Sequence, residues 1–383
     1  MRLFYPAVFS LVLILSGVSS AQAQQGGPVG WVKRMAGKFF RDTLPPDRPR
    51  FLLYPTIVYA PETSFELGLS GLLLFHARND LERSRLSELQ VFGFGTLKGQ
   101  YGLWLDNFIY GHDDRWLLLG QNRFQYFPLL YFGIGAQQND NEAALIDATY
   151  LKLRQRAMLR LAPNLFGGLE LDFQHLYNTR FNQPEVGRPY DLPRGAAGTT
   201  NLGTGLGLVY DNRRNPLNPR DALYGEVAYL RSSDRFVSQY SFSTLVVDAR
   251  VYRPLADKQV LAAHVYGLQT YGDVPFNQLA LMGGEIIQRG FYAGRYRDQS
   301  LLAGQVEYRF LPFPFSKRFG GAVFASAGAV APSWRELEWR NVQPTGGMGL
   351  RYLLYPKKDI FLRFDLGFTR QGTGFYIFTG ESF

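Results

Sequence analysis

The sequence has no cysteine and only four histidines among its 383 residues. The absence of cysteine excludes disulfide-stapled scaffolds, thiol nucleophiles and cysteine-ligated zinc or iron–sulfur sites. The histidines, His76, His112, His175 and His264, stand on separate segments without the spacing of metal ligands, and no G-x-S-x-G, H-E-x-x-H or phosphate-loop motif is present. We therefore expect no enzyme active site, no metal and no cofactor.

The sequence also lacks any run of about 18 consecutive apolar residues, so it predicts no transmembrane helix. Its N-terminus combines a basic start, a short apolar run at 8–15 and a following group of small residues. This is the layout of a secretory signal peptide, which we place at residues 1–23. Residues 24–50 form a short segment with a predicted amphipathic helix at 30–42. The chain is therefore expected to leave the cytoplasm.

Aromatic residues are abundant, at 15%, although the mean hydropathy is only -0.15. From residue 51 onward apolar and polar residues alternate, as where Val306 and Tyr308 oppose Glu307 and Arg309. Many of these segments reach about ten residues, which is longer than the typical strand of a soluble protein. The predicted strands are 53–60, 64–76, 86–97, 100–110, 115–126, 147–161, 165–177, 201–211, 222–232, 241–253, 259–271, 301–311, 319–330, 346–355, 359–370 and 374–382.

The connections between these strands alternate in length. Those after even-numbered strands are mostly tight, whereas three after odd-numbered strands are long, at about 127–145, 177–200 and 272–300. Short turns at one rim and long loops at the other are typical of bacterial outer-membrane barrels, which also have an even number of strands. The sequence thus predicts an all-β fold, a transmembrane antiparallel barrel of about sixteen strands over 51–383, in the outer membrane of a Gram-negative bacterium.

A barrel with an apolar outside and a polar lumen accounts for the composition. Lipid would contact the outer face, and aromatics near the strand ends would form the two interfacial girdles. The net charge of +9 is then assigned to the lumen and to lipid phosphates, so we expect outer-membrane lipid as a partner and no nucleic acid. The predicted girdle residues are Tyr54, Tyr59, Trp104, Tyr110, Trp116, Tyr126, Phe127, Tyr131, Tyr229, Tyr355 and Phe361.

Residues 283–292 carry a glycine pair followed by Arg289, Gly290 and Phe291, and the next strand, 301–311, contains the matching segment 304–309. This combination resembles the sixth outer loop and following strand of the BamA/TamA family, the bacterial surface antigen barrels. The resemblance implies a loop folded into the lumen, with Arg289 as its anchor, Gly290 at a turn and Phe291 packed against the wall. A bidentate charge pair would hold such a loop in a watery lumen better than apolar contacts.

The sequence departs from the family at the motif F-x-D-x-G, where Ser326 stands in place of the usual aspartate. The acidic partner of Arg289 is therefore expected to be Glu307 or Asp365, which lie on the polar faces of their strands. Arg309 and Arg363 share those polar faces.

Two further segments support the resemblance. Residues 210–220 contain Asp211, Arg213, Pro216 and Pro219 and are similar to a periplasmic turn of the family, for which we expect a structural role. Residues 375–383 form an alternating segment that ends in Phe383. Such an ending resembles the signal read by the outer-membrane assembly machinery, a partner during biogenesis.

The family acts through a weak seam between the first and last strands. Here the first strand contains Pro55 and Tyr59, and Gly374 and Gly380 loosen the last. Well-known members carry periplasmic POTRA domains, for which the 27 residues of 24–50 are too few. The resemblance therefore implies a barrel-only member that assists insertion or translocation of protein or lipid, and it leaves room for a separate periplasmic partner.

Other functions remain open from the sequence. The predicted lumen cations, Lys152, Arg154, Arg156, Arg160, Arg250, Arg309 and Arg363, would suit a passive anion-preferring channel, or the protein could be a structural surface protein. A barrel lipase would need a Ser–His pair at the membrane rim, where His112 or His175 could supply the histidine.

Overall fold

The computed structural model describes residues 48–60, 64–97, 99–136, 143–185 and 187–383. The predicted signal peptide and the predicted helix at 30–42 lie outside the described residues. Among those that are described, no helix has the length and apolar character needed to cross a membrane.

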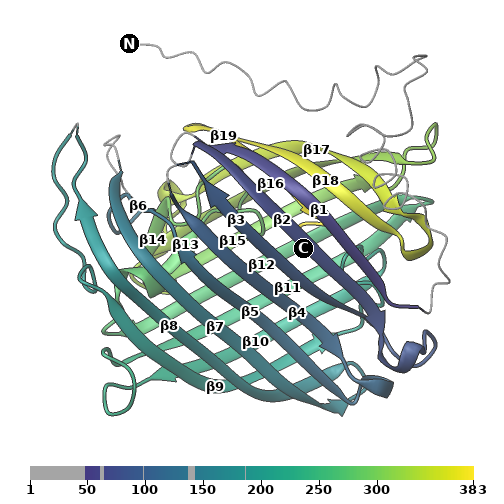
Figure 1. The fold of residues 1–383 in the computed structure, drawn as a ribbon, viewed down its shortest axis with the longest axis horizontal. Coiled ribbons are helices and arrows are strands. Elements are labelled where there is room, and N and C mark those ends of the chain that lie inside the picture. Colours follow the sequence, from purple (N-terminus) through teal and green to yellow (C-terminus); the bar gives the residue numbers. More distant parts are fainter. Residues whose placement is uncertain (1–47, 61–63, 98, 137–142, 186) are drawn as a thin grey trace, which may run out of the picture. The chain divides into compact units, whose positions relative to one another are not determined.

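The described chain is dominated by one antiparallel sheet of 17 strands (Figure 1). Its strands are β1 (Arg50–Ala60), β2 (Ser64–His76), β3 (Leu86–Thr96), β4 (Tyr101–Tyr110), β5 (Trp116–Tyr126), β6 (Leu129–Tyr131), β7 (Ala144–Ala162), β8 (Leu165–Asn182), β9 (Thr199–Asp211), β10 (Ala222–Ser232), β11 (Phe242–Ala256), β12 (Gln259–Gly272), β15 (Ser300–Phe310), β16 (Phe319–Ala331), β17 (Gln343–Tyr355), β18 (Ile360–Thr369) and β19 (Gly372–Thr379). Because the three-residue β6 only continues β5 alongside β7, sixteen full strands remain in the described part of the chain. The prediction of a sixteen-stranded β-barrel is confirmed.

Short elements occupy the connections. The antiparallel pair of β13 (Ala280–Met282) and β14 (Tyr296–Asp298), three residues each, forms a separate small sheet. The 3-10 turns are η1 (Ala77–Asn79), η2 (His112–Asp114), η3 (Phe276–Gln278), η4 (Trp334–Glu336), η5 (Trp339–Asn341) and η6 (Pro356–Lys358). The long connections 127–143, 183–198 and 273–299 follow β5, β8 and β12, which are the fifth, seventh and eleventh of the sixteen full strands. The short connections 163–164, 257–258 and 356–359 follow β7, β11 and β17, which are the sixth, tenth and fourteenth. Long connections after odd strands and short ones after even strands confirm the predicted asymmetry.

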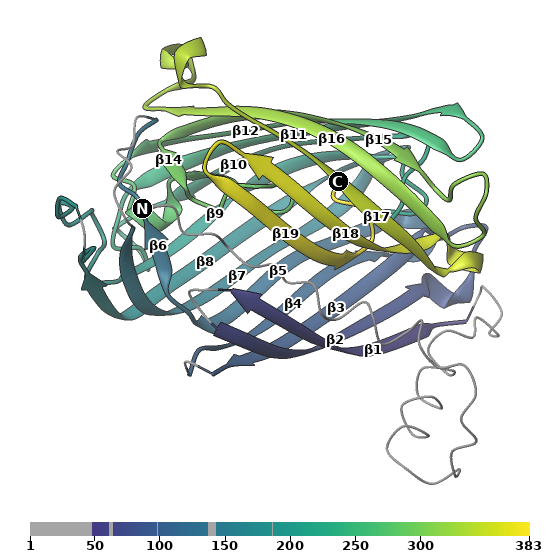
Figure 2. The same ribbon diagram turned by 90° about the horizontal axis from the view of Figure 1, so that it is seen from above.

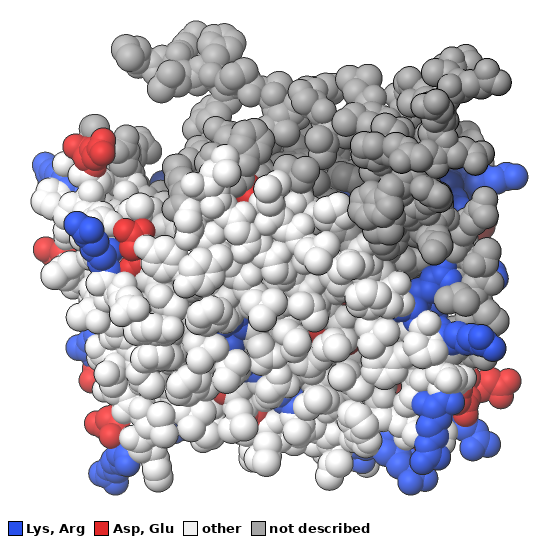
Figure 3. Space-filling model, viewed as in Figure 1, with Lys and Arg blue, Asp and Glu red and all other residues white. Residues whose placement is uncertain are grey.

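Alternation along the strands sorts side chains between lipid and lumen. Val306 is 49% exposed on β15, whereas its neighbour Glu307 is fully buried. Figure 3 shows the result on one face, where a broad belt free of charge lies between charged residues at the two rims. Burying apolar strand faces in lipid while polar residues fill the lumen is the arrangement that a transmembrane barrel requires.

The aromatic girdle agrees with the prediction only in part. Trp116 and Tyr229 are exposed on the outer surface, at 44% and 51%. Four other predicted girdle residues are instead buried, namely Tyr110, Tyr131, Tyr355 and Phe361. Tyr110 shows the reason, because its hydroxyl donates a 2.7 Å hydrogen bond to the buried carboxylate of Asp211. Near the barrel ends an aromatic ring with a polar tip fits the lumen as well as the lipid boundary.

The pairing of the strands runs from β1 to β19 without a crossover, and each strand pairs with its neighbour in sequence. Within the described residues, no backbone pairing joins β1 to β19. The sheet curls round so that these two edge strands lie on the same side of the barrel (Figures 1 and 2). The barrel therefore has a seam, defined here as the two unpaired edges of β1 and β19.

Candidate functional site in the lumen

The long connection 273–299 between β12 and β15 folds back against the inner wall. At Gly290 the backbone has φ +110°, a conformation that favours glycine, and its N–H donates a 3.0 Å hydrogen bond to the hydroxyl of Tyr376 on β19. Gly367 on β18 lies directly beneath this turn, and a Cβ there would come within 2.7 Å of the Arg289 carbonyl carbon. Glycines on both sides thus let the loop backbone approach the wall closely enough for Arg289 to reach the charged side chains.

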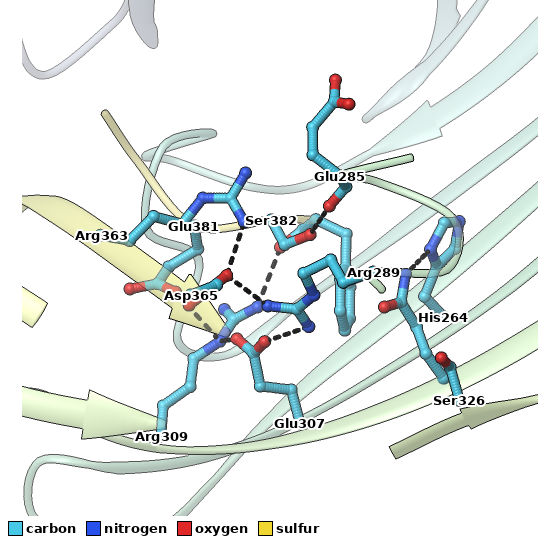
Figure 4. Close-up of polar contacts among 12 residues, drawn as sticks. His264, Glu285, Arg289, Glu307, Arg309, Ser326, Arg363, Asp365, Glu381 and Ser382 are labelled. Atoms are coloured by element: carbon cyan, nitrogen blue, oxygen red, sulfur yellow. Dashed lines mark hydrogen bonds and ion pairs between the residues drawn. The ribbon is translucent and has the colours of Figure 1, made fainter. Parts of the chain in front are cut away.

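Arg289 is buried between two carboxylates from different strands (Figure 4). Its Nη1 donates to Asp365 Oδ2 at 2.6 Å, and its Nη2 donates to Glu307 Oε2 at 2.5 Å. The guanidinium also lies over the ring of Phe324, with 3.5 Å from its central carbon to the ring centroid. One planar cation therefore joins β15 to β18 and stacks on β16, a combination that suits arginine and not lysine.

Three more arginines complete this group, which we call the lumen ion cluster: Arg289, Arg309, Arg351, Arg363, Glu307, Asp365 and Glu381. Arg309 Nε donates to Glu307 at 2.6 Å, and Arg363 Nη1 donates to Asp365 at 2.8 Å. Arg351 donates to Asp365 at 2.5 Å and to Glu381 at 2.9 Å. Arg351 and Glu381 belong to the site although neither was predicted from the sequence. The inward position of Arg351 on an alternating strand was the signal that could have indicated it.

Ser326, the residue at the family's usual aspartate position, is not a partner of Arg289. Its hydroxyl is hydrogen-bonded to that of Thr345 at 2.5 Å on the neighbouring strand. Phe291 lies in a buried cluster with wall residues of β15 and β16 and meets the ring of Tyr296 edge-on at 5.6 Å. The loop is thus held by charge at Arg289 and by apolar packing at Phe291.

The segment after β19 is where the structure overturns a prediction. We expected a strand through residue 382, but β19 ends at Thr379 and Gly380, with φ +87°, turns the chain inward. The N–H of Glu381 then donates to Leu217 O at 2.8 Å, and the Ser382 hydroxyl donates to Glu285 O at 2.6 Å. These contacts replace ladder pairing, and they keep residues 380–383, here called the tail, inside the barrel.

Phe383 is consequently buried in the lumen. Its ring stacks on His264 with centroids 5.2 Å apart, and its carbonyl oxygen accepts a 3.1 Å hydrogen bond from Arg309. Figure 4 shows the tail residues Glu381 and Ser382 beside Arg289 and Glu307. The same arginine, Arg309, therefore holds both a wall carboxylate and the end of the tail.

The connection 212–221 closes part of the short-turn rim below the tail. Asp211 accepts hydrogen bonds from the backbone N–H, Nε and Nη2 of Arg213, at 2.9 to 3.0 Å, and the Arg213 guanidinium lies 4.3 Å from the ring centre of Tyr224. Pro219 is buried and Pro216 is partly exposed in this turn, where a missing N–H leaves no donor unpaired. The contacts of Asp211 and Arg213 are those of a structural turn.

Residues 111–383 match the profile of the Omp85 superfamily domain. The chain belongs to the Omp85 superfamily. Its fold is similar to BamA from Haemophilus ducreyi lacking POTRA domains 1-3, with a TM-score of 0.53, 15% identity, and coverage of 87% of this chain and 69% of that one. It is similar also to CdiB from Acinetobacter baumannii, with a TM-score of 0.53, 12% identity, and coverage of 86% of this chain but only 59% of CdiB. No curated protein matches the sequence.

Membership of the Omp85 superfamily places the barrel in the outer membrane of a Gram-negative bacterium. Its lipid-facing belt and its lumen ion cluster thereby occupy distinct environments, hydrocarbon outside and a polar interior. Ion pairs in that interior are shielded from bulk water more than surface pairs are, so their geometry matters more to stability.

The seam of this Omp85 barrel contains the residues that the sequence indicated. Pro55 lies in β1 opposite Leu69 of β2, and as a proline it contributes no N–H to either neighbour. The backbone of Tyr59 pairs with Phe65, while nothing is described of its side chain. Gly374 in β19 pairs with Gly367, and a Cβ at Gly374 would lie 2.6 Å from the Tyr376 hydroxyl.

A second charged group lines the opposite wall of the lumen. Arg156 on β7 donates to Glu226 on β10 at 2.7 Å, reaching past β8 and β9 inside the lumen. Arg154 lies 3.3 Å from Glu170, and Arg250 donates to Asp248 at 2.6 Å. Most of the predicted lumen arginines thus form ion pairs with carboxylates, and their positive charge is compensated within the lumen. Among the described residues, no group of three or more His, Asp or Glu side chains could hold a metal ion.

Proposed function

We propose that this Omp85 barrel assists the insertion or translocation of other polypeptides at the outer membrane, and that β1 and β19 form the working edge. The observation that carries the proposal is the seam: the first and last barrel strands, β1 and β19, show no backbone pairing with each other in the described chain. An unpaired strand edge offers a row of N–H and C=O groups that can pair with a strand of another chain.

The two edges differ in how strongly they are held. β1 pairs with β2 over all eleven of its residues, whereas β19 has eight residues paired to β18 before Gly380 turns the chain away. Pro55 removes one backbone donor from β1, which weakens the hydrogen bonding of this strand. These features favour an edge that exchanges partners over a permanently closed barrel.

The alternative of an anion-preferring channel has less support. Arg156, Arg250 and Arg309 each form an ion pair with a buried carboxylate, which removes the uncompensated positive charge that would attract anions. The loop held by Arg289 also lies within the lumen and occupies part of its cross-section.

Site-specific photocrosslinking in living cells tests the proposal. A photoreactive phenylalanine analogue placed at Phe375 of β19, or at Phe51 of β1, would probe lipid-facing positions of the seam strands, which are 52% and 65% exposed. Tyr229 on β10, a lipid-facing aromatic that is 51% exposed, is the matched control. We expect adducts with other polypeptides at 375 and 51 and lipid adducts alone at 229.

Depletion of the protein should lower the level of the captured polypeptides in the outer membrane. Lipid adducts alone at all three positions, or equal capture at residue 229, would refute the proposal. A captured periplasmic protein that is not itself inserted would identify the separate periplasmic partner that the sequence leaves room for.

A further inference from the structure

A cavity of about 340 Å³ lies in the lumen apart from the ion cluster. Its walls are the inner faces of β7 to β12, and residues between 277 and 293 of the inserted loop line one side. The volume lies at the lower end of the range for small-molecule sites. The cavity is therefore large enough for a short single-chain ligand and too small for a lipid with two acyl chains.

One wall of the cavity carries two cationic side chains. Lys152 and Arg154 alternate with an outward residue on β7, so both line the cavity. Lys152 forms no hydrogen bond or ion pair with any described residue, and the Nε of Arg154 is buried without a partner while Nη2 lies 3.3 Å from Glu170. A buried donor such as Arg154 Nε is costly unless a ligand or water accepts from it.

The acidic groups of the cavity do not satisfy these donors. Both oxygens of Asp172 accept hydrogen bonds of 3.1 Å from Gln174, whose own oxygen accepts from Tyr150. Glu285 belongs to the loop wall, and Figure 4 shows its carboxylate directed away from the lumen ion cluster. One anionic ligand group is thus favoured at β7, while a second anion near Glu285 would be repelled.

Part of the remaining wall is apolar, although Ser232, Thr244, Asn277 and Gln278 also border the cavity. Leu230, Val246 and Leu268 line it from β10 to β12, and Leu281 and Ile287 face them from the loop. Apolar side chains that border a cavity inside a polar lumen gain free energy when a hydrocarbon group displaces the water there, by about 25 cal/mol for each Å² removed from water. A charged end and an apolar side in one cavity define an amphiphilic site.

We propose that this cavity binds a single-chain amphiphile with one carboxylate, its head on Lys152 and Arg154 and its chain against Leu230, Val246 and Leu268. The monocarboxylate follows from the two unsatisfied donors on one strand, and the short chain follows from the volume. The site is independent of the seam, because its walls include neither β1 nor β19.

Equilibrium dialysis with radiolabelled octanoate tests the site, using the full-length barrel in lipid nanodiscs and empty nanodiscs as the blank. Saturable binding above the blank is expected, with octanol and octanedioate competing at least tenfold less well than unlabelled octanoate. Lys152→Gln should weaken binding about tenfold, since a charge-assisted hydrogen bond is lost. Leu268→Asn should weaken it as well by removing apolar contact.

Lys258→Gln is the matched control, because Lys258 is an exposed lysine in the turn between β11 and β12. Heat-modifiable migration on gels shows that each variant is folded. No saturable binding above the empty nanodiscs, equal competition by octanol, or equal affinity of folded Lys152→Gln and Lys258→Gln would each overturn the proposal.

Discussion

Replacing Asp365 by asparagine should destabilise the barrel more than replacing Arg289 by glutamine, although the two residues form one ion pair. The lumen ion cluster contains four guanidinium groups and three carboxylates. Asp365 accepts from Arg289, Arg351 and Arg363 at 2.6, 2.5 and 2.8 Å, so its neutralisation leaves four buried cations with only two carboxylates and removes the single carboxylate partner that Arg363 has among the described residues. Removing Arg289 instead takes away the excess cation.

The magnitudes follow from this imbalance. Loss of one partner from a buried ion pair costs about 3–5 kcal/mol, which is the expectation for Asp365→Asn. After Arg289→Gln, Glu307 keeps its 2.6 Å contact with Arg309, and Asp365 keeps two arginines, so the cost should be about 1–3 kcal/mol. The difference of about 2 kcal/mol corresponds to roughly a 30-fold change in the unfolding equilibrium.

The assay is urea unfolding of the barrel in phospholipid vesicles, followed by tryptophan fluorescence. The double variant Asp365→Asn with Arg289→Gln should be more stable than Asp365→Asn alone, because it lowers the excess of buried cations from two to one, the wild-type value. Asp106→Asn is a control, since Asp106 is 37% exposed beside Arg123 and such pairs contribute under about 1 kcal/mol. If Arg289→Gln proved as damaging as Asp365→Asn, the charge-balance reasoning would be wrong.

Two further changes test the packing of the loop and the tail. Gly367→Val should displace the loop at Arg289, where a Cβ would lie only 2.7 Å away, and so raise protease cleavage of the loop; Gly225→Val, at a site with nothing within 4 Å, should leave cleavage unchanged. Phe383→Ala should lower the free energy of unfolding by about 3 kcal/mol, since the ring is 3% exposed, and a variant with unaltered urea midpoint would contradict the lumen position of this residue.

The strands were predictable because lipid imposes a strict rule on each of them. β2 (Ser64–His76) and β10 (Ala222–Ser232) were predicted at the observed bounds, because turn residues and charged residues flank two long strand-forming segments. β8 runs to Asn182, five residues past its predicted end. Beyond the lipid boundary both faces of a strand can be polar, so periodicity no longer marks where it ends.

The candidate site was predictable where the alternation itself indicates the inner face. Glu307 and Asp365 stood out as partners of Arg289 because both occupy inward positions on regular strands. Glu381 did not, since its inward position depends on the turn at Gly380 and on a hydrogen bond to Leu217, which is far away in the sequence. Contacts of that kind arise from the closure of the barrel and have no local pattern.

The lumen ion cluster also connects the inserted loop to the seam. Arg351 binds Asp365, which holds Arg289 of the loop, and it binds Glu381 of the tail, which continues directly from edge strand β19. A shift of β19 that carried Glu381 away would leave Arg351 and Arg309 with one carboxylate fewer among four buried arginines. Because an uncompensated buried cation is unfavourable, the tail cannot leave without weakening the ion pairs that hold Arg289. The position of the loop and the state of the seam are therefore linked through one shared set of charges.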